Sequence, residues 1–216
     1  MNKVYLKDND TYLEYFEQNH KIYQNSDLVP SIYEGGYKLW ECSYDLLNYI
    51  QESVKFSGLN VIELGCGIGL PGLYALLLGA NVIFQDYNQE VIQNATIPTI
   101  KSNLLRLGHM ADYQRAEFMF GSWKCLEPKQ CDIILTSETI YNEGNYGDLI
   151  GIMVRCLKEN GVIIVAAKKF YFGVGGGINQ FKDFVAKDKR LKIYGEHVIS
   201  NGLGNIRGIL LINKTI

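Results

Sequence analysis

The sequence predicts an α/β fold, with a mostly parallel sheet, helices on both faces and a C-terminal antiparallel hairpin. The chain has 216 residues, 47% hydrophobic and 20% charged, which suits one core of ordinary size. From residue 58 onward, short apolar runs alternate with stretches of helical periodicity, as in βαβ units. Two β-rich runs near the C-terminus are separated only by a turn-rich segment, which predicts the hairpin.

We expect residues 1–25 to form a helical extension and residues 26–216 to form the main domain. The main domain begins with a helix for which Ser43 is the expected N-cap and Gly58 the stop. Its apolar residues recur on one face of that helix, which indicates packing against the sheet. They are Leu46, Leu47, Ile50 and Val54.

Runs rich in Val and Ile are expected to form the strands, because strands buried on both faces are nearly continuous in hydrophobicity. These runs are residues 59–64, 81–85, 116–120, 132–136 and 162–167. Helices are expected between them. Residues 70–78 and 148–158 have helical periodicity, and a further helix follows residues 173–177, with Phe181 and Phe184 on one face. The C-terminal hairpin is assigned to residues 191–200 and 206–213.

The charge balance argues against nucleic acid as the leading partner. The net charge is -2 and the pI about 5.9, whereas nucleic-acid affinity comes largely from clustered Lys and Arg. Residues 1–52 hold nine acidic residues against four Lys, which indicates either a docking surface for a basic protein or a solvated acidic face. The basic segment 155–192 keeps RNA contact open as a minor option.

The five cysteines are widely spaced and contain no C-x-x-C pair, so neither a disulfide framework nor a metal site is indicated. Reduced thiols fit the cytoplasm, with the nucleus as a second option. No apolar run reaches the roughly 18 residues of a membrane span. We therefore expect no membrane partner and no metal cofactor.

The strongest local motif is a buried strand that runs directly into the glycine sequence Gly65-Cys66-Gly67-Ile68-Gly69. Glycines let the backbone approach a ligand, and the following helix N-terminus favours an anionic group. The spacing is G-x-G-x-G, which differs from the G-x-G-x-x-G of dinucleotide enzymes. Asp86 ends the next strand 21 residues after Gly65, where a carboxylate can accept from both ribose hydroxyls. The alternative is a tight turn and an ordinary strand-end Asp.

Two tryptophans are further candidates for this site. Trp123 follows the third strand within Gly121-Ser122-Trp123, where an indole can cover an adenine ring, and a core aromatic is an equal alternative. Trp40 precedes the first helix of the domain. On composition alone, Trp40 fits the core better than a cofactor contact.

Five segments together resemble the protein-histidine N-methyltransferases of the methyltransferase-like group, Rossmann-like class I enzymes with a seven-stranded sheet. The segments are VPSIYEGGYKLWECSYDLLNY (residues 29–49), the glycine motif (61–69), FQDYN (84–88), LTSETIYN (135–142) and YFGVGGG (171–177). The similarity covers roughly residues 26–212. Members of that family methylate one histidine of a large-subunit ribosomal protein.

The resemblance implies that the chain binds S-adenosyl-L-methionine, releases S-adenosyl-L-homocysteine and acts as a monomer on a basic ribosomal protein at the tele nitrogen. The cofactor residues it implies are Leu39, Trp40, Glu41, Cys42, Ser43, Glu63, Gly65, Gly67, Gln85, Asp86, Tyr87, Gly121, Ser122, Trp123 and Ser137. Glu63 stands where the family commonly has Asp, which preserves the charge. A protein-lysine methyltransferase on the same scaffold and a non-catalytic escort of a basic protein stay open as alternatives.

Glu138 is the first candidate for the acceptor site, because Glu138-Thr139-Ile140-Tyr141 matches the acidic-x-x-aromatic signature of the wider group. A histidine, with a pKa near 6.5, is mostly neutral at pH 7, so positioning matters more than a strong base. Glu138 would hold the far ring N–H, with Tyr141 and Asn142 as alternates, or would only brace the loop. The glycines of residues 173–177 are expected to close over the acceptor peptide, with a flexible linker as the alternative.

Overall fold

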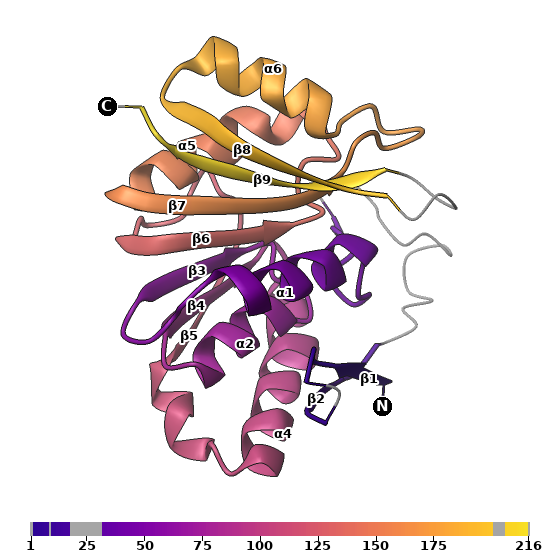
Figure 1. Ribbon diagram of the computed structural model, residues 1–216, viewed down its shortest axis with the longest axis vertical. Coiled ribbons are helices and arrows are strands. Elements are labelled where there is room, and N and C mark those ends of the chain that lie inside the picture. Colours follow the sequence, from indigo (N-terminus) through magenta and orange to yellow (C-terminus); the bar gives the residue numbers. More distant parts are fainter. Residues whose placement is uncertain (1, 9, 18–31, 201–205, 216) are drawn as a thin grey trace.

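The computed structural model describes residues 2–8, 10–17, 32–200 and 206–215. These residues include a seven-stranded sheet with the order β5-β4-β3-β6-β7-β9-β8 (Figure 1). Its strands are β3 (Asn60–Leu64), β4 (Asn81–Asp86), β5 (Ala116–Phe120), β6 (Cys131–Ser137), β7 (Leu157–Lys168), β8 (Leu191–Ile199) and β9 (Arg207–Lys214). Strands β3 to β7 pair in parallel, and β9 pairs antiparallel with both β7 and β8. The predicted fold class is confirmed.

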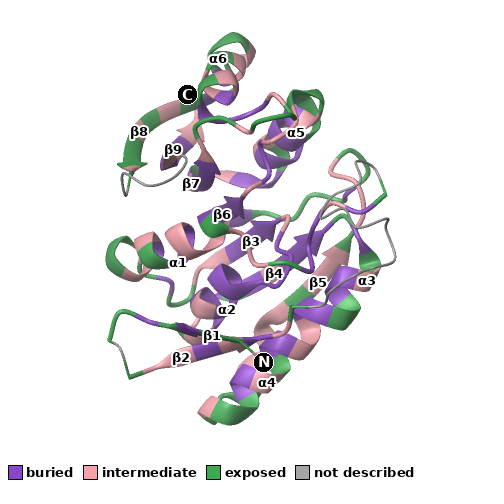
Figure 2. Ribbon diagram, turned by 90° about the vertical axis from the view of Figure 1, so that its right-hand side faces the viewer, coloured by how far each residue is buried: buried purple, intermediate pink, exposed green. Residues whose placement is uncertain are grey.

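Helices cover both faces of the sheet (Figures 1 and 2). One face carries α1 (Glu41–Ser53), α2 (Leu70–Leu77) and α4 (Ile97–Leu107), and the other carries α5 (Tyr146–Cys156) and α6 (Ile178–Asp188). Short helical segments complete the described chain: α3 (Gln89–Val91), η1 (Ile92–Thr96), η2 (Met110–Arg115) and η3 (Glu143–Asn145). Among the described residues, no helix has the length and apolar character to cross a membrane.

The two faces of the sheet build two separate cores, because successive side chains of a strand point to opposite faces. In β6, Ile133 and Leu135 pack with the cluster that includes α1 and α2, whereas Ile134 packs with the cluster of α5 and α6. Figure 2 shows the central strands buried between these layers. Both faces of the sheet are therefore covered by helices, and the carboxyl ends of its parallel strands are the expected place for a site.

The helix borders differ from the sequence expectations in three places. Helix α1 ends at Ser53, with Val54 as its extended C-cap residue, so the prediction that Gly58 is its stop is wrong. Helix α1 begins at Glu41 with Trp40 as its N-cap residue, so the prediction that Ser43 is the N-cap is wrong. Helix α5 ends at Cys156, and strand β7 already begins at Leu157, earlier than expected. The predicted strands and the C-terminal hairpin otherwise coincide closely with β3–β9. The turn expected at residues 201–204 lies outside the described residues.

The N-terminal segment is not helical where the structure describes it. Strands β1 (Asn2–Tyr5) and β2 (Tyr12–Tyr15) form an antiparallel hairpin that lies beside α4 (Figure 1), so the helical prediction for residues 1–25 is wrong over these strands. The inward side chains Val4, Leu13 and Tyr15 join the core under α1 and α2. The hairpin is thus packed against the domain. The proposed division at residue 25 stays a prediction.

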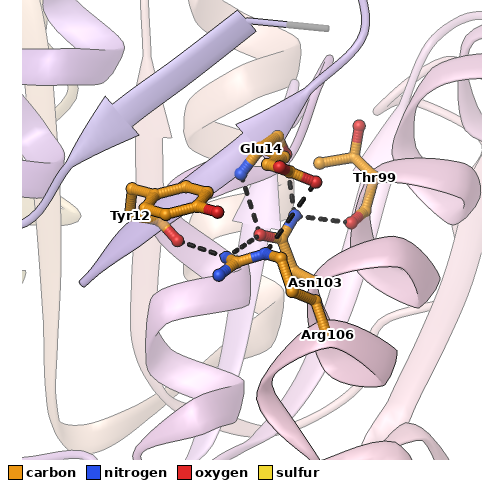
Figure 3. Close-up of polar contacts among 5 residues, drawn as sticks. All are labelled: Tyr12, Glu14, Thr99, Asn103 and Arg106. Carbon is orange, nitrogen blue, oxygen red and sulfur yellow. Dashed lines mark hydrogen bonds and ion pairs between the residues drawn. The ribbon is translucent and has the colours of Figure 1, made fainter.

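Asn103 on α4 attaches this hairpin through backbone hydrogen bonds (Figure 3). Its amide accepts from the Glu14 N–H at 2.8 Å and donates to the Glu14 carbonyl at 2.7 Å. The same amide donates to the Thr99 carbonyl at 2.8 Å, and Arg106 donates to the Tyr12 carbonyl. Asn103 is fully buried. Its side chain satisfies the backbone N–H and carbonyl of Glu14, as a neighbouring strand would do for β2.

We expect Asn103→Ala to lower the free energy of unfolding by about 2 kcal/mol, because the buried backbone groups of Glu14 lose their partners. Thermal unfolding should show a midpoint roughly 4–8 °C below wild type for a chain of this size. Asn48→Ala is the matched control, since Asn48 is exposed on α1. Equal midpoints for the two variants would show that Asn103 does not anchor the hairpin.

Candidate functional site

A cavity of about 560 Å³ opens at the carboxyl ends of β3, β4 and β6. This edge is where open α/β sheets bind ligands, and the volume lies within the range of small-molecule sites. Thirteen predicted site residues line it: Leu39, Trp40, Ser43, Gly65, Gly67, Asp86, Tyr87, Gly121, Ser122, Trp123, Ser137, Glu138 and Tyr141. The fold therefore gathers residues from five separate segments of the sequence into one space.

The glycine motif forms the floor of the cavity and leaves no room for side chains. Gly65 and Gly67 have φ values of 62° and 51°, in the left-handed region. A Cβ at Gly65 would lie 2.6 Å from Thr139 Cγ2, and one at Gly67 would lie 3.0 Å from the Gly36 carbonyl oxygen. The motif is thus packed closely against Thr139 and Gly36, which also line the cavity.

Asp86 is the buried anion of the site. One carboxylate oxygen accepts from the Gly67 N–H at 2.9 Å, and the other accepts from the Asn88 N–H at 3.1 Å. Burial raises the pKa of Asp86 to about 6, while the backbone hydrogen bonds of Asn88 and Gly67 oppose this shift. The carboxylate is held next to the glycine loop and has lone pairs left for a ligand hydroxyl.

Gln85 connects the glycine loop to the adenine end that the sequence predicts. Its side-chain oxygen accepts from Trp123 Nε1 at 2.8 Å and from the Gly65 N–H at 3.3 Å. Its amide nitrogen donates to the Gly121 carbonyl at 3.0 Å. Gln85 lies outside the cavity lining and orients three residues that belong to it. Trp123 lines the cavity, with its ring fixed by this hydrogen bond.

The segment before α1 covers the opposite side of the cavity. Asn88 donates to the Ile32 carbonyl at 2.8 Å and accepts from the Glu34 N–H at 3.1 Å, which fastens the segment to the end of β4. Trp40 Nε1 donates to the Gly35 carbonyl at 3.0 Å. Trp40 lines the cavity and is partly buried, and its contact with a cofactor stays a prediction.

Four other predicted residues lie outside the lining. Glu41 is exposed and forms an ion pair with Lys168 at 3.4 Å. Cys42 is buried on α1, and Asn142 accepts from the Gly144 N–H at 2.9 Å, where it caps a short helical turn. Glu63 is buried under α2, and burial raises its pKa to about 8. Each of these four has a structural partner or a core position instead of a cavity-facing one.

Glu138 lies at the far end of the cavity, directly after β6. Its backbone has φ 58°, an uncommon conformation for a residue with a side chain and one that often marks functional sites. One carboxylate oxygen accepts from the Cys42 N–H at 3.2 Å, so Glu138 satisfies a donor at the start of α1. The bracing role is therefore present, and it coexists with a place in the cavity lining.

The far end also contains residues that were not predicted as site residues. They are Glu34, Thr139, Lys168, Tyr171 and Phe172. Tyr171 belongs to the YFGVGGG segment noted in the sequence. Burial raises the pKa of Tyr171 well above its ordinary value, and the negative charge of Glu138 raises it further. Phe172 is 75% exposed at the rim. Within the described part of the chain, no group of three or more His, Cys, Asp or Glu side chains could hold a metal ion.

We expect Glu138→Ala to weaken cofactor binding about tenfold, because the Cys42 N–H loses its acceptor at the start of α1, where Trp40 and Ser43 line the cavity. Glu138→Gln should retain cofactor affinity, since its amide oxygen can still accept, and should lower turnover because the charge is lost. Titration calorimetry measures the cofactor affinity of each variant, and single-turnover kinetics measure its rate of reaction. Wild-type turnover of the Gln variant would exclude a role for the Glu138 charge in the reaction.

The fold is that of a class I methyltransferase. Its features are the strand order of the sheet, the C-terminal β8–β9 hairpin and a cavity beside the glycine loop. Magnesium protoporphyrin IX methyltransferase from Synechocystis PCC 6803, solved with bound SAH, shares this fold with a TM-score of 0.61 at 14% identity, over 79% of this chain and 81% of that one. A family model described as "Lysine methyltransferase" matches residues 18–172. The chain belongs to this family.

Two curated relatives are more similar in sequence. "Histidine protein methyltransferase 1 homolog" of Dictyostelium discoideum is 44% identical over 91% of this chain and 63% of its own length. The protein of the same name from Bos taurus is 38% identical over 83% of this chain and 56% of its own length. The chain thus spans somewhat over half the length of these relatives.

Proposed function

We propose that the protein is an S-adenosylmethionine-dependent protein-histidine N-methyltransferase. The observation that carries this proposal is the continuity of one cavity from the buried Asp86 to Glu138 and Tyr141. Such a cavity can hold a nucleoside-containing methyl donor at one end and an amino-acid side chain at the other. The names of the two relatives support histidine as the acceptor.

The lining fits S-adenosylmethionine part by part. Asp86 would accept from the ribose hydroxyls, and the methionine portion would lie along the glycine loop at Gly65, which lines the cavity. At Gly121 a Cβ would meet nothing within 4 Å, so the adenine end is open beside Trp123. Bound here, the cofactor would supply an activated methyl group on a sulfonium.

The far end of the cavity, where Glu138 and Tyr141 lie, would hold the side chain to be methylated, and we call it the acceptor end. Its role is to position that side chain and to supply negative charge. Methyl transfer to nitrogen requires a lone pair about 3–3.5 Å from the methyl carbon and in line with the bond that breaks. A neutral imidazole offers that lone pair at pH 7 without a base, while a lysine, with a pKa near 10.4, must first lose a proton. Glu138 and Glu34 both line the cavity, and their carboxylates would stabilise an imidazolium formed beside them.

We further propose a basic large-subunit ribosomal protein as the substrate and the tele nitrogen as the methylated atom, in line with the resemblance in the sequence. The acidic N-terminal quarter suits a basic partner. A monomer in the cytoplasm, with the nucleus as a second location, completes this proposal. Protein-lysine methylation is the second candidate, because the matching family model has that description.

The glycine-rich loop of residues 173–177 is proposed to contact the substrate peptide through its tip. Gly176 and Gly177 are buried and donate to the Tyr141 carbonyl and the Tyr146 hydroxyl, both at 3.0 Å, which disagrees with a flexible linker at these two positions. The tip at Phe172 and Val174 is exposed and borders the cavity. Closure of the tip over a peptide stays a prediction, which amide exchange with and without peptide can check.

The test is incubation with radiolabelled S-adenosylmethionine and a ribosome-containing extract, followed by acid hydrolysis and separation of methylated amino acids. Label in methylhistidine of one large-subunit protein is the expected result. Label in methyl-lysine would replace the proposed acceptor by the second candidate. Cofactor binding without any transferred label would instead favour a non-catalytic escort of a basic protein.

A further inference from the structure

Glu34 and Tyr141 meet at the acceptor end of the cavity, although they are 107 residues apart in the chain. The hydroxyl of Tyr141 donates to the Glu34 carboxylate oxygen Oε2, and both side chains line the cavity. Both residues are partly buried, so water screens this contact less than it would at the surface. The contact between Glu34 and Tyr141 arises from the tertiary fold, and no local sequence motif includes both residues.

We infer that Glu34 is a positioning residue that acts through Tyr141 and selects the attacking nitrogen of the acceptor histidine. This inference rests on the proposed function. By accepting the Tyr141 O–H, Glu34 leaves only lone pairs on the Tyr141 oxygen for the substrate. That oxygen then receives the N–H of the target imidazole.

The selection follows from the hydrogen-bonding capacity of each group. A tyrosine hydroxyl has one proton to donate, and an ionised carboxylate is a strong acceptor that fixes where that proton points. A neutral imidazole has one N–H and one lone pair, on different nitrogens. When Tyr141 accepts the N–H of the imidazole, the lone pair of the other nitrogen faces the methyl donor. Tyr141 thereby selects the tautomer that reacts.

Tyr141 suits this contact better than Glu138 does. The Glu138 carboxylate is already engaged by the Cys42 N–H at 3.2 Å and interacts with Tyr171, whose pKa it helps to raise. The rings of Tyr141 and Tyr171 stand 6.3 Å apart at 69°, and both line the cavity. Glu138 therefore contributes charge and anchors α1, while Tyr141 offers the oriented oxygen.

Glu34 is tied to the cofactor end by a chain of hydrogen bonds. Its N–H donates to the Asn88 side chain at 3.1 Å, and the Asn88 N–H donates to Asp86 at 3.1 Å. Burial is the main cause of the raised pKa of Asp86, and the charge of Glu34 raises it further. The backbone of Glu34 is thus connected through Asn88 to the residue proposed to bind the ribose.

The transfer step balances with these groups. The imidazole lone pair forms the new N–C bond, the C–S bond breaks, and its electron pair goes to sulfur, which becomes a neutral thioether. The ring becomes an imidazolium whose remaining N–H is bound by Tyr141. Glu34 stabilises the positive charge through that hydroxyl, and the proton leaves to water after product release.

The experiment compares wild type, Glu34→Gln, Glu34→Asp and Tyr141→Phe with a histidine-containing substrate. Gln keeps the size of Glu but removes the charge, and its amide N–H can turn the Tyr141 hydroxyl toward the substrate. We expect turnover of Glu34→Gln and Tyr141→Phe to fall at least about tenfold. The residual product should be divided between the two ring nitrogens, while cofactor affinity changes less than about threefold. Glu34→Asp should partly restore both turnover and selectivity.

Glu143→Gln is the control, because Glu143 is exposed and outside the lining. A Glu34→Gln variant that methylates one nitrogen at the wild-type rate would overturn the inference and leave the proposed function intact. Absence of methylhistidine with wild type would overturn the proposed function and the inference with it. A purely structural role for Glu34 would lower cofactor affinity and turnover together without changing the methylated nitrogen, and would also refute the inference.

Discussion

Asp86→Asn should weaken the binding of S-adenosyl-L-homocysteine about 100-fold, since hydrogen bonds to a charged group contribute about 1.5–3 kcal/mol each. The carboxylate accepts from Gly67 and Asn88 with separate oxygens. An asparagine has one acceptor oxygen, so its NH₂ group would face one of these N–H donors. The variant therefore loses both the ribose acceptor and part of the loop anchor. Titration calorimetry at pH 8 measures the effect.

Asp148→Asn is the matched control, because Asp148 borders the same cavity but is exposed at its far end. Its affinity for the ligand should remain within about threefold of wild type. An Asp86→Asn affinity equally close to wild type would mean that the cofactor does not use this carboxylate. The proposed placement of the ribose would then be wrong.

Cofactor affinity should also depend on pH through Asp86, whose pKa in the ligand-free protein is raised to about 6 by burial. Above this pH the carboxylate is ionised and ready to accept hydroxyl hydrogen bonds. Below it, a proton must be lost before binding, so affinity should fall up to about tenfold per pH unit. The slope should be absent in Asp86→Asn. An equal slope in that variant would assign the pH dependence to another group.

The parts of the site that sequence reasoning found are those encoded by local pattern. The glycine loop and Asp86 each follow directly on an apolar strand, and parallel strands end at one edge of the sheet. Glu34 and Tyr171 were missed because their roles depend on tertiary contacts with residues far away in the chain. No periodicity or spacing in the sequence reports such contacts.

Two of the wrong fold predictions, at the start of α1 and in the N-terminal segment, have different causes. The first turn of α1 is satisfied in part by Glu138, which lies 96 residues away, so a local search for an N-cap selected Ser43 instead. Ser43 actually contacts Ser137 through their hydroxyls at 2.9 Å. In the N-terminal hairpin, Leu13 and Tyr15 are buried and the residue between them is not, which is a strand period. That alternation was a usable signal, although each strand has only four residues.

Gly176→Ala should lower methyl transfer about 100-fold while leaving cofactor affinity within about threefold, because a displacement of about 1 Å near reacting groups can have an effect of this size. A Cβ at Gly176 would lie 2.5 Å from the Tyr141 carbonyl group and 2.6 Å from the Ile140 carbonyl oxygen. Both contacts are with backbone, so no side chain can turn away to relieve them. The loop must then move from the acceptor end.

That movement would disturb both tyrosines of the acceptor end. Gly176 donates to the Tyr141 carbonyl at 3.0 Å and accepts from the Tyr171 N–H at 2.9 Å. Gly147→Ala is the control, since a Cβ there meets nothing within 4 Å. Single-turnover rates and ligand titration on both variants separate chemistry from binding. A Gly176→Ala enzyme with wild-type rates would show that the loop does not position Tyr141, and equal losses of rate and affinity would point to a general change of fold.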